Sequence, residues 1–188
     1  MSIFSVSNFQ GVIDNRGGLS RPNRFVVHIH PPHGLDGGVL KDLHILCESA
    51  SFPTRSLATA DQKMYGPIRK IARESIYADL ALNFVVPADY SVKHFFDRWQ
   101  NLAQNDREYD PSYYDTYIGD ITLYAMRETD TNLPGNESSE APYSIQLEEC
   151  FPMQVGDIAM SSSDTAYGKL QITFAYRRWF NRKIHKEI

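Results

Sequence analysis

Cysteine and long apolar runs are scarce in this chain of 188 residues, and their scarcity excludes two classes of protein. The two cysteines, Cys47 and Cys150, lie far apart in the sequence and form no disulfide framework. Every apolar run is much shorter than the roughly 18 residues that a membrane helix needs. The first ten residues also lack the basic and apolar regions of a signal peptide. We therefore expect synthesis in a reducing cytoplasm and no membrane contact.

Catalytic motifs are missing as well. The sequence contains no glycine-rich loop for phosphate, no nucleophile elbow and no closely spaced pair of cysteines. Alternation along a strand places Cys150 opposite Glu149 and ahead of a turn at Phe151-Pro152. We interpret Cys150 as a small, half-buried residue at the end of a strand rather than as a nucleophile. The sequence predicts neither enzymatic activity nor a cofactor.

Two clusters have part of the spacing of metal ligands. The first consists of three histidines, His28, His30 and His33. Alternate residues of a strand point the same way, but two prolines interrupt the cluster and no acid or cysteine follows at ligand spacing. The run 106–110 imitates the start of a calcium loop, yet Pro111 replaces the loop glycine and Tyr117 the closing glutamate. We predict no metal site, and keep a small metal-dependent enzyme that uses the histidines as an alternative.

The net charge of −4 conceals a strong segregation of charge along the chain. Residues 106–164 contain thirteen acidic and two basic side chains, whereas the remainder contains seventeen basic and ten acidic ones. This distribution is compatible with a solvated surface, and it also suits a molecule whose acidic and basic parts meet head to tail between copies. The excess of acid argues against a nucleic-acid reader that depends on phosphate contacts.

Apolar residues recur mostly with a period of two. Alternation is clear in five segments: 25–30, 77–86, 121–125, 143–147 and 170–176. Prolines and glycines bound most of these runs, as expected for strands that end in turns. Antiparallel strands with one buried face predict a mainly β fold, a β-sandwich or barrel, with the whole chain 1–188 forming a single domain.

Residues 91–104 depart from this period and predict one amphipathic α-helix. Apolar residues fall at helical spacing after a cap at Asp89-Tyr90-Ser91. We expect an aromatic stripe on this helix to pack against the sheet as part of the core; its members are Phe95, Phe96 and Trp99.

Residues 59–76 predict an extended β-hairpin around a turn at Tyr65-Gly66-Pro67. An isolated two-stranded ribbon is marginal in water, and this one has few apolar residues, so we expect it to lie on a neighbouring subunit. The side chains that we predict for this contact are Lys63, Tyr65, Arg69, Lys70 and Arg73. Three further segments are expected to be flexible or ordered by assembly: 1–20, 128–142 and 181–188.

The order of several stretches resembles the tail tube protein of contractile-tailed bacteriophages. These stretches are RPNRFVVHI at 21–29, CESASFP at 47–53, IRKIARES at 68–75, the strand-to-helix passage 80–100 and the ending LEECFPMQVGDIAMSS…LQITFAYRRW at 147–179. The resemblance covers most of residues 20–180 and rests on the order and spacing of these motifs. Baseplate proteins that start the tube are similar in fold, and the type VI secretion tube protein is a more distant relative.

The resemblance implies a structural subunit that forms hexameric rings, which stack into a hollow tube inside a contractile sheath. It implies that genome DNA passes through the bore without specific binding, that sheath and baseplate proteins are partners, and that assembly into the virion tail occurs in the host bacterial cytoplasm. It also implies that Cys150-Phe151-Pro152 is a corner between two strands. A ring that initiates or terminates the tube is the alternative.

Passage of DNA favours an acidic lumen, because a basic lining would bind the DNA phosphates and slow the movement of the DNA. Six copies at −4 each would supply such a wall. We predict a negative lumen, with Asp120 and Glu148 as candidate lining residues. An outer wall that meets sheath or water is the alternative position for these acids.

Overall fold

The computed structural model describes residues 5–35, 38–63, 65–106, 110–128, 130, 141–163 and 165–186. Within them the chain is mainly β, as predicted, and all strand pairs are antiparallel. None of the described helices is long and apolar enough to span a membrane.

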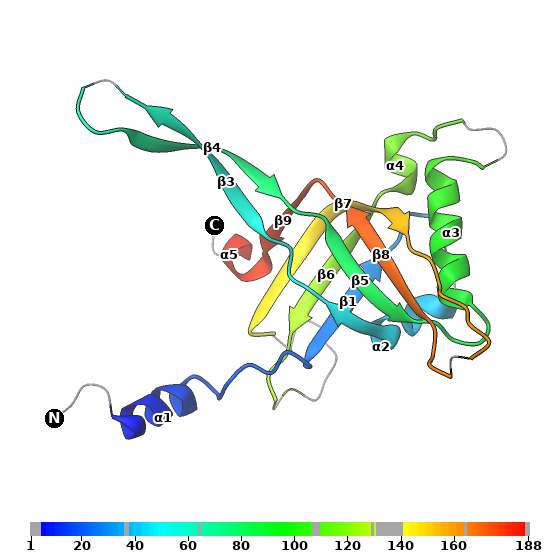
Figure 1. Ribbon diagram of the computed structural model, residues 1–188, viewed down its shortest axis with the longest axis horizontal. Coiled ribbons are helices and arrows are strands. Elements are labelled where there is room, and N and C mark those ends of the chain that lie inside the picture. The colour runs from blue at the N-terminus through cyan, green and yellow to red at the C-terminus, as the bar shows by residue number, and fades with distance from the viewer. Residues whose placement is uncertain are drawn as a thin grey trace.

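Seven strands form the body of the molecule (Figure 1). Their bounds are β1 Phe25–His30, β2 Cys47–Ala50, β5 Leu80–Val85, β6 Gly119–Ala125, β7 Tyr143–Val155, β8 Lys169–Ala175 and β9 Arg178–Asn181. The order is β1-β6-β7-β8-β5-β2, and β9 pairs with β7 outside this path. Each of the five alternating segments overlaps one of these strands, β1, β5, β6, β7 and β8 in chain order, which confirms the period-two prediction.

Strand β7 belongs to both halves of the sheet. Its first part pairs with β6 and β9, and its second part, from Phe151 onward, pairs with β8. The bend between the two parts falls at Glu149, whose φ of 55° is in the left-handed region, and Gly119 of β6 pairs with Cys150 just beyond it. A β-bulge of this kind bends a strand while pairing continues on either side.

Four expectations about this region are wrong. Cys150 is completely buried rather than half-buried, and it lies within a strand rather than at its end. Phe151-Pro152 forms no turn, because both residues continue β7 and pair with β8. The corner therefore lies inside one strand and not between two, since the extra residue at Glu149 reorients β7 without interrupting it.

The core lies on the side of the strands where alternation gathers the apolar residues. The fully buried members are Leu80, Leu82, Phe84, Ile121, Leu147, Leu170, Ile172 and Phe174. In register, Leu82 of β5 faces Ile172 of β8, and Ile121 of β6 faces Leu147 of β7. Cross-strand apolar pairs of this kind are the unit of sheet stabilisation.

Helix α3, Ser91–Ala103, forms at the predicted position and closes one side of the core (Figure 1). Its Trp99 ring is stacked on Phe96 and lies edge-on to Phe174 of β8. The Trp99 Nε1–H donates to the carbonyl of Tyr117 at 2.7 Å, which ties α3 to α4, Tyr114–Tyr117. Asp89 accepts hydrogen bonds from the Ser91 backbone N–H and hydroxyl at the helix start.

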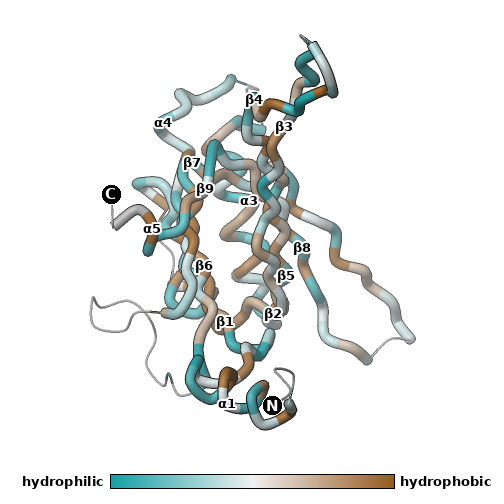
Figure 2. The backbone as a smooth tube through the Cα atoms, turned by 90° about the vertical axis from the view of Figure 1, so that its left-hand side faces the viewer, coloured by the Kyte–Doolittle hydropathy of each residue, from teal (hydrophilic) through white to brown (hydrophobic). Residues whose placement is uncertain are grey.

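The predicted hairpin forms a separate two-stranded sheet, β3 Arg55–Gln62 with β4 Arg69–Tyr77. It begins four residues earlier than predicted and projects from the body in Figure 1. Figure 2 shows apolar and polar residues alternating along it.

Short helical elements complete the structure. They are α1 Val6–Asn15, the 3₁₀ helix η1 Gly38–Lys41, α2 Leu43–Leu46 and α5 Arg182–Lys186. None of these four elements was predicted from the sequence. Of the segments expected to be flexible or assembly-ordered, 1–4, 129, 131–140 and 187–188 lie outside the described residues.

Candidate assembly surfaces

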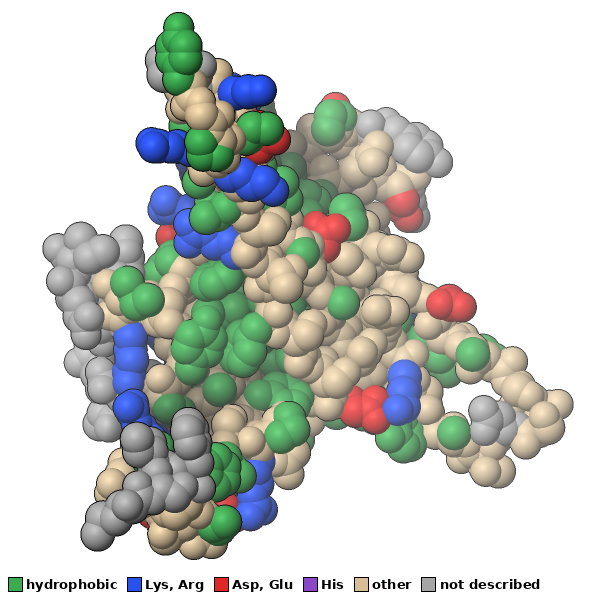
Figure 3. Space-filling model, turned by 60° about the vertical axis from the view of Figure 1, so that its left-hand side comes forward, with side chains coloured by type: hydrophobic (Ala, Val, Ile, Leu, Met, Phe, Trp, Pro, Cys, Tyr) green, Lys and Arg blue, Asp and Glu red, His purple; other side chains and the backbone are tan. Residues whose placement is uncertain are grey.

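The projecting hairpin presents cations and apolar side chains together. Four of the five residues predicted for subunit contact, Lys63, Tyr65, Arg69 and Lys70, lie around the turn between β3 and β4, and Arg73 lies in the middle of β4. Figure 3 shows Lys and Arg side chains gathered along the hairpin. Tyr65 is 100% exposed, and Ile68 and Ile71 are 58% and 46% exposed. Large apolar side chains so exposed on a thin ribbon make the hairpin a candidate contact surface.

The hairpin has more exposed apolar side chains than we predicted from the sequence. Leu57 and Ile76, nearer the body, are also more than half exposed. The register pairs Ser56 with Ile76 and Leu57 with Ser75, so the two apolar side chains point to opposite faces. Both faces of the ribbon are therefore available for contact.

Helix α1 is a second exposed apolar element. Val6, Phe9 and Val12 are 74%, 65% and 61% exposed, and no residue of this helix is buried. Figure 1 shows α1 standing away from the sheet. Figure 3 shows apolar side chains on the face of the body between α1 and the hairpin.

Of the two candidate lumen acids, Glu148 lies at the bend of β7 and Asp120 lies in the adjacent strand β6. The Glu148 carboxylate accepts from Arg178 Nε at 2.6 Å, and Asp120 accepts from the backbone N–H of Glu149. Glu149 itself pairs with Arg177 at 2.6 Å, and this hydrogen bond holds the pKa of its carboxyl below the usual range. This cluster joins β6, β7 and β9.

The histidines are grouped differently from the sequence pattern. His28 lies near His30 and near His44 of α2, with ring centroids 6.5 and 6.3 Å apart, and packs edge-to-face on Tyr124 at 5.4 Å. His33 is exposed and takes no part in these ring contacts. Burial and the two neighbouring histidines lower the pKa of His28. Among the described residues, no group of three potential ligands is placed to hold a metal ion.

The two cysteines are inert as nucleophiles. Cys47 is 7% exposed, and burial raises the pKa of its thiol to about 12. Burial also raises the pKa of Cys150. Both thiols stay protonated at neutral pH, and the thiolate is the reactive form.

The described chain is thus an antiparallel sheet bent around one shared strand, with exposed apolar and basic elements projecting from it. The family model described as phage tail tube protein matches residues 20–182, and the chain belongs to this family. Comparison with curated protein sequences finds no match.

Solved structures with a similar fold come from contractile injection systems. A chain of the sheath–tube complex of an extracellular contractile injection system, PVC, has a TM-score of 0.62 at 17% identity, covering 95% of this chain and 98% of that one. The tube-terminating cap of the anti-feeding prophage has a TM-score of 0.63 at 16% identity, covering 87% and 91%. A chain of the baseplate of that prophage has a TM-score of 0.57 at 16% identity, covering 87% and 97%.

Proposed function

We propose that this chain is the building subunit of a phage tail tube, in which six copies close into a ring and rings stack into a hollow conduit for genome DNA. The observation that carries the proposal is the family match over residues 20–182. The family's role is structural, and the exposed hairpin and α1 supply surfaces suited to contact between copies.

The unpaired edges of the sheet support closure into a ring. In the described chain, β1 and β2 end the strand order, so each of them pairs with a strand on one side only. Exposed edges of this kind promote uncontrolled pairing unless they are covered. Pairing between copies in a closed ring covers all of them at once.

The proposed surroundings of the tube follow from the similar structures. The PVC chain comes from a sheath–tube complex and an anti-feeding prophage chain from a baseplate. We infer that this tube lies inside a contractile sheath, contacts a baseplate and assembles in the cytoplasm of the host bacterium before becoming part of the virion tail.

Electron microscopy of the purified full-length chain in negative stain tests the proposal. We expect long hollow tubes whose end views have sixfold symmetry. Single rings that never elongate would instead support a tube initiator or terminator, a role that the similarity to the tube-terminating cap favours as the alternative. A protein that remains monomeric at all concentrations would contradict both. Elemental analysis of the same sample tests the metal-dependent alternative.

A further inference from the structure

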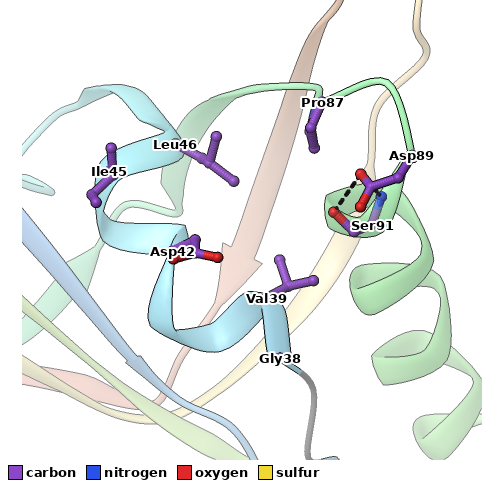
Figure 4. Close-up of a pocket in the computed structure, with 8 residues that line it drawn as sticks. All are labelled: Gly38, Val39, Asp42, Ile45, Leu46, Pro87, Asp89 and Ser91. Atoms are coloured by element: carbon purple, nitrogen blue, oxygen red, sulfur yellow. Dashed lines mark hydrogen bonds between the residues drawn. The ribbon is translucent and has the colours of Figure 1, made fainter.

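A groove lies between the α2 region and the start of α3 (Figure 4). It encloses about 600 Å³ and is lined by Gly38, Val39, Asp42, Ile45, Leu46, Pro87, Asp89 and Ser91. Figure 4 shows Val39, Leu46 and Pro87 pointing into a shared space. A volume of this size is within the range of pockets that take a large side chain or a ligand.

The rim of this groove is acidic. Asp42 is exposed, and its side chain makes no capping hydrogen bond to α2. Asp89 lies on the other side, and hydrogen bonds from Ser91 hold the pKa of its carboxyl below the usual range. Ile45 is 73% exposed beside them. The groove therefore offers an apolar floor between the side chains of two aspartates.

The tip of the β3–β4 hairpin has the complementary composition. Tyr65 is fully exposed and Ile68 is 58% exposed, while Arg69 and Lys70 follow directly in the chain. A buried tyrosine contributes a large apolar area with a polar end, and cations next to carboxylates steer association.

The hairpin and the groove lie at opposite ends of the molecule. In Figure 1 the hairpin extends to the upper left, whereas α2 and the start of α3 lie at the lower right. The hairpin of one chain cannot reach the groove of the same chain. Two complementary surfaces at opposite ends make a head-to-tail contact, which generates an open stack where its rotation does not close into a ring.

We propose that this groove receives the hairpin tip of a copy in the next ring, with Tyr65 on the apolar floor and Arg69 and Lys70 beside Asp42 and Asp89. The inference rests on the proposed tube function. It adds that the groove is the surface through which each ring contacts the next ring.

Disulfide trapping tests the contact directly. Tyr65→Cys combined with Ile45→Cys places one thiol on the tip and one in the groove, and both native cysteines are buried. After assembly in reductant and mild oxidation, we expect a ladder of cross-linked chains that extends beyond six subunits. The matched control pairs Tyr65→Cys with Tyr113→Cys, an equally accessible position that is 88% exposed on another part of the surface.

Two results of the disulfide-trapping experiment would contradict the proposal. Tubes that form normally but give no more cross-linking than the control would place the hairpin elsewhere. A ladder that stops at six subunits would place the contact within one ring rather than between rings.

Charge exchange provides a second test. Asp42→Lys with Asp89→Asn reverses the rim while keeping a hydrogen-bond acceptor for Ser91. We expect this variant to form rings but to reduce tube formation about tenfold or more, as for other close charge pairs at interfaces. Combining it with Arg69→Glu and Lys70→Glu should restore tubes, because the two opposed charges are exchanged.

Acidic residues away from the groove supply the control. Asp110→Lys with Asp115→Lys changes exposed acids in the acidic segment 106–164 and should leave tube growth unchanged. If these changes stop growth while the groove variant assembles normally, the hairpin contacts the acidic segment and the groove proposal is wrong. Failure of the unaltered chain to form tubes would instead refute the proposed function.

Discussion

Gly119 is the residue at which three elements approach most closely. A Cβ atom there would lie 2.4 Å from the carbonyl oxygen of His30 in β1 and 3.0 Å from the Trp99 ring in α3. Backbone on one side and a buried ring on the other leave no flexible group that could move aside. Glycine at this position lets β6 pass between β1 and α3.

Gly119→Ala should therefore destabilise the fold by about 1–3 kcal/mol, the usual cost of overpacking. Urea denaturation followed by tryptophan fluorescence measures the change. Gly11→Ala in α1 is the matched control, because nothing lies within 4 Å of its added Cβ. Equal stability of the two variants would show that β6 can shift away from Trp99 without cost.

His28 should make stability depend on pH in the mildly acidic range. The groups facing it are His30 on β1, His44 on α2 and Tyr124 on β6, whose ring and hydroxyl contact Arg182. The pKa of His28 is lower in the folded protein than its ordinary value of about 6.5. The stability that neutral His28 contributes to the fold is therefore present above about pH 6.5 and is lost as the pH falls below it.

We expect the thermal unfolding midpoint to fall between pH 7 and pH 5, and His28→Gln to reduce this fall. His33→Gln, at an exposed position outside the cluster, serves as the control. The same pH dependence in the His28→Gln variant and the unaltered chain would assign the effect to other groups.

At the scale of elements, α3 holds the largest buried side chain of the core. Trp99 is fully buried, packs on Phe96 and Phe174, and donates to the carbonyl of Tyr117. Trp99→Ala should cost about 3–5 kcal/mol of stability. The measurement is best made in a non-assembling background, with Met160→Ala, 77% exposed, as control. Unchanged stability would mean that the aromatic stripe faces a partner or solvent.

A second prediction at this scale concerns the role of the hairpin in assembly. Reversing Arg69, Lys70 and Arg73 to Glu should stop tube growth, because it replaces three exposed cations on a ribbon that projects from the body of the molecule (Figure 1). The circular dichroism spectrum and melting temperature should remain those of the unaltered chain. Tubes of normal length from the triple variant would show that the hairpin is not the contact.

Elements with strong periodicity could be predicted from sequence, whereas those set by tertiary contacts could not. The strands around Leu82 and Ile172 and the helix around Phe96 follow directly from their apolar spacing. The bend at Glu149 depends on how β7 pairs with two different neighbours, which alternation alone does not encode.

Short helices and grooves were missed for a related reason. Helix α2 has only four residues, too few for a periodic pattern, and its packing on β1 stabilises it. Through α2, residues Asp42 and Ile45 come to lie opposite Asp89, more than forty positions later in the chain. The cations of the hairpin were visible in the sequence, but the surface complementary to them was not.

At the scale of the whole molecule, the sign of the lumen charge can be tested in the assembled tube. We predict a negative lumen potential, with Asp120 and Glu148 among its lining residues, although Arg178 compensates Glu148 within the subunit. A cryo-EM structure of the tube measures this directly, since the charges of the side chains nearest the axis can be summed. A positive sum would contradict the idea that the wall repels DNA.

The pairing of β1 with β6 also governs how the chain must fold during synthesis. Phe25 pairs with Ala125 and His30 with Asp120, so β1 leaves the ribosome long before its partner exists. At roughly 5 to 20 residues per second, β6 follows on the order of 5 to 20 seconds later. For that interval Val27 and the backbone of β1 have no native contacts in the sheet. The nascent subunit thus cannot offer a paired β1 edge to another copy until β6, which ends at Ala125, has been translated.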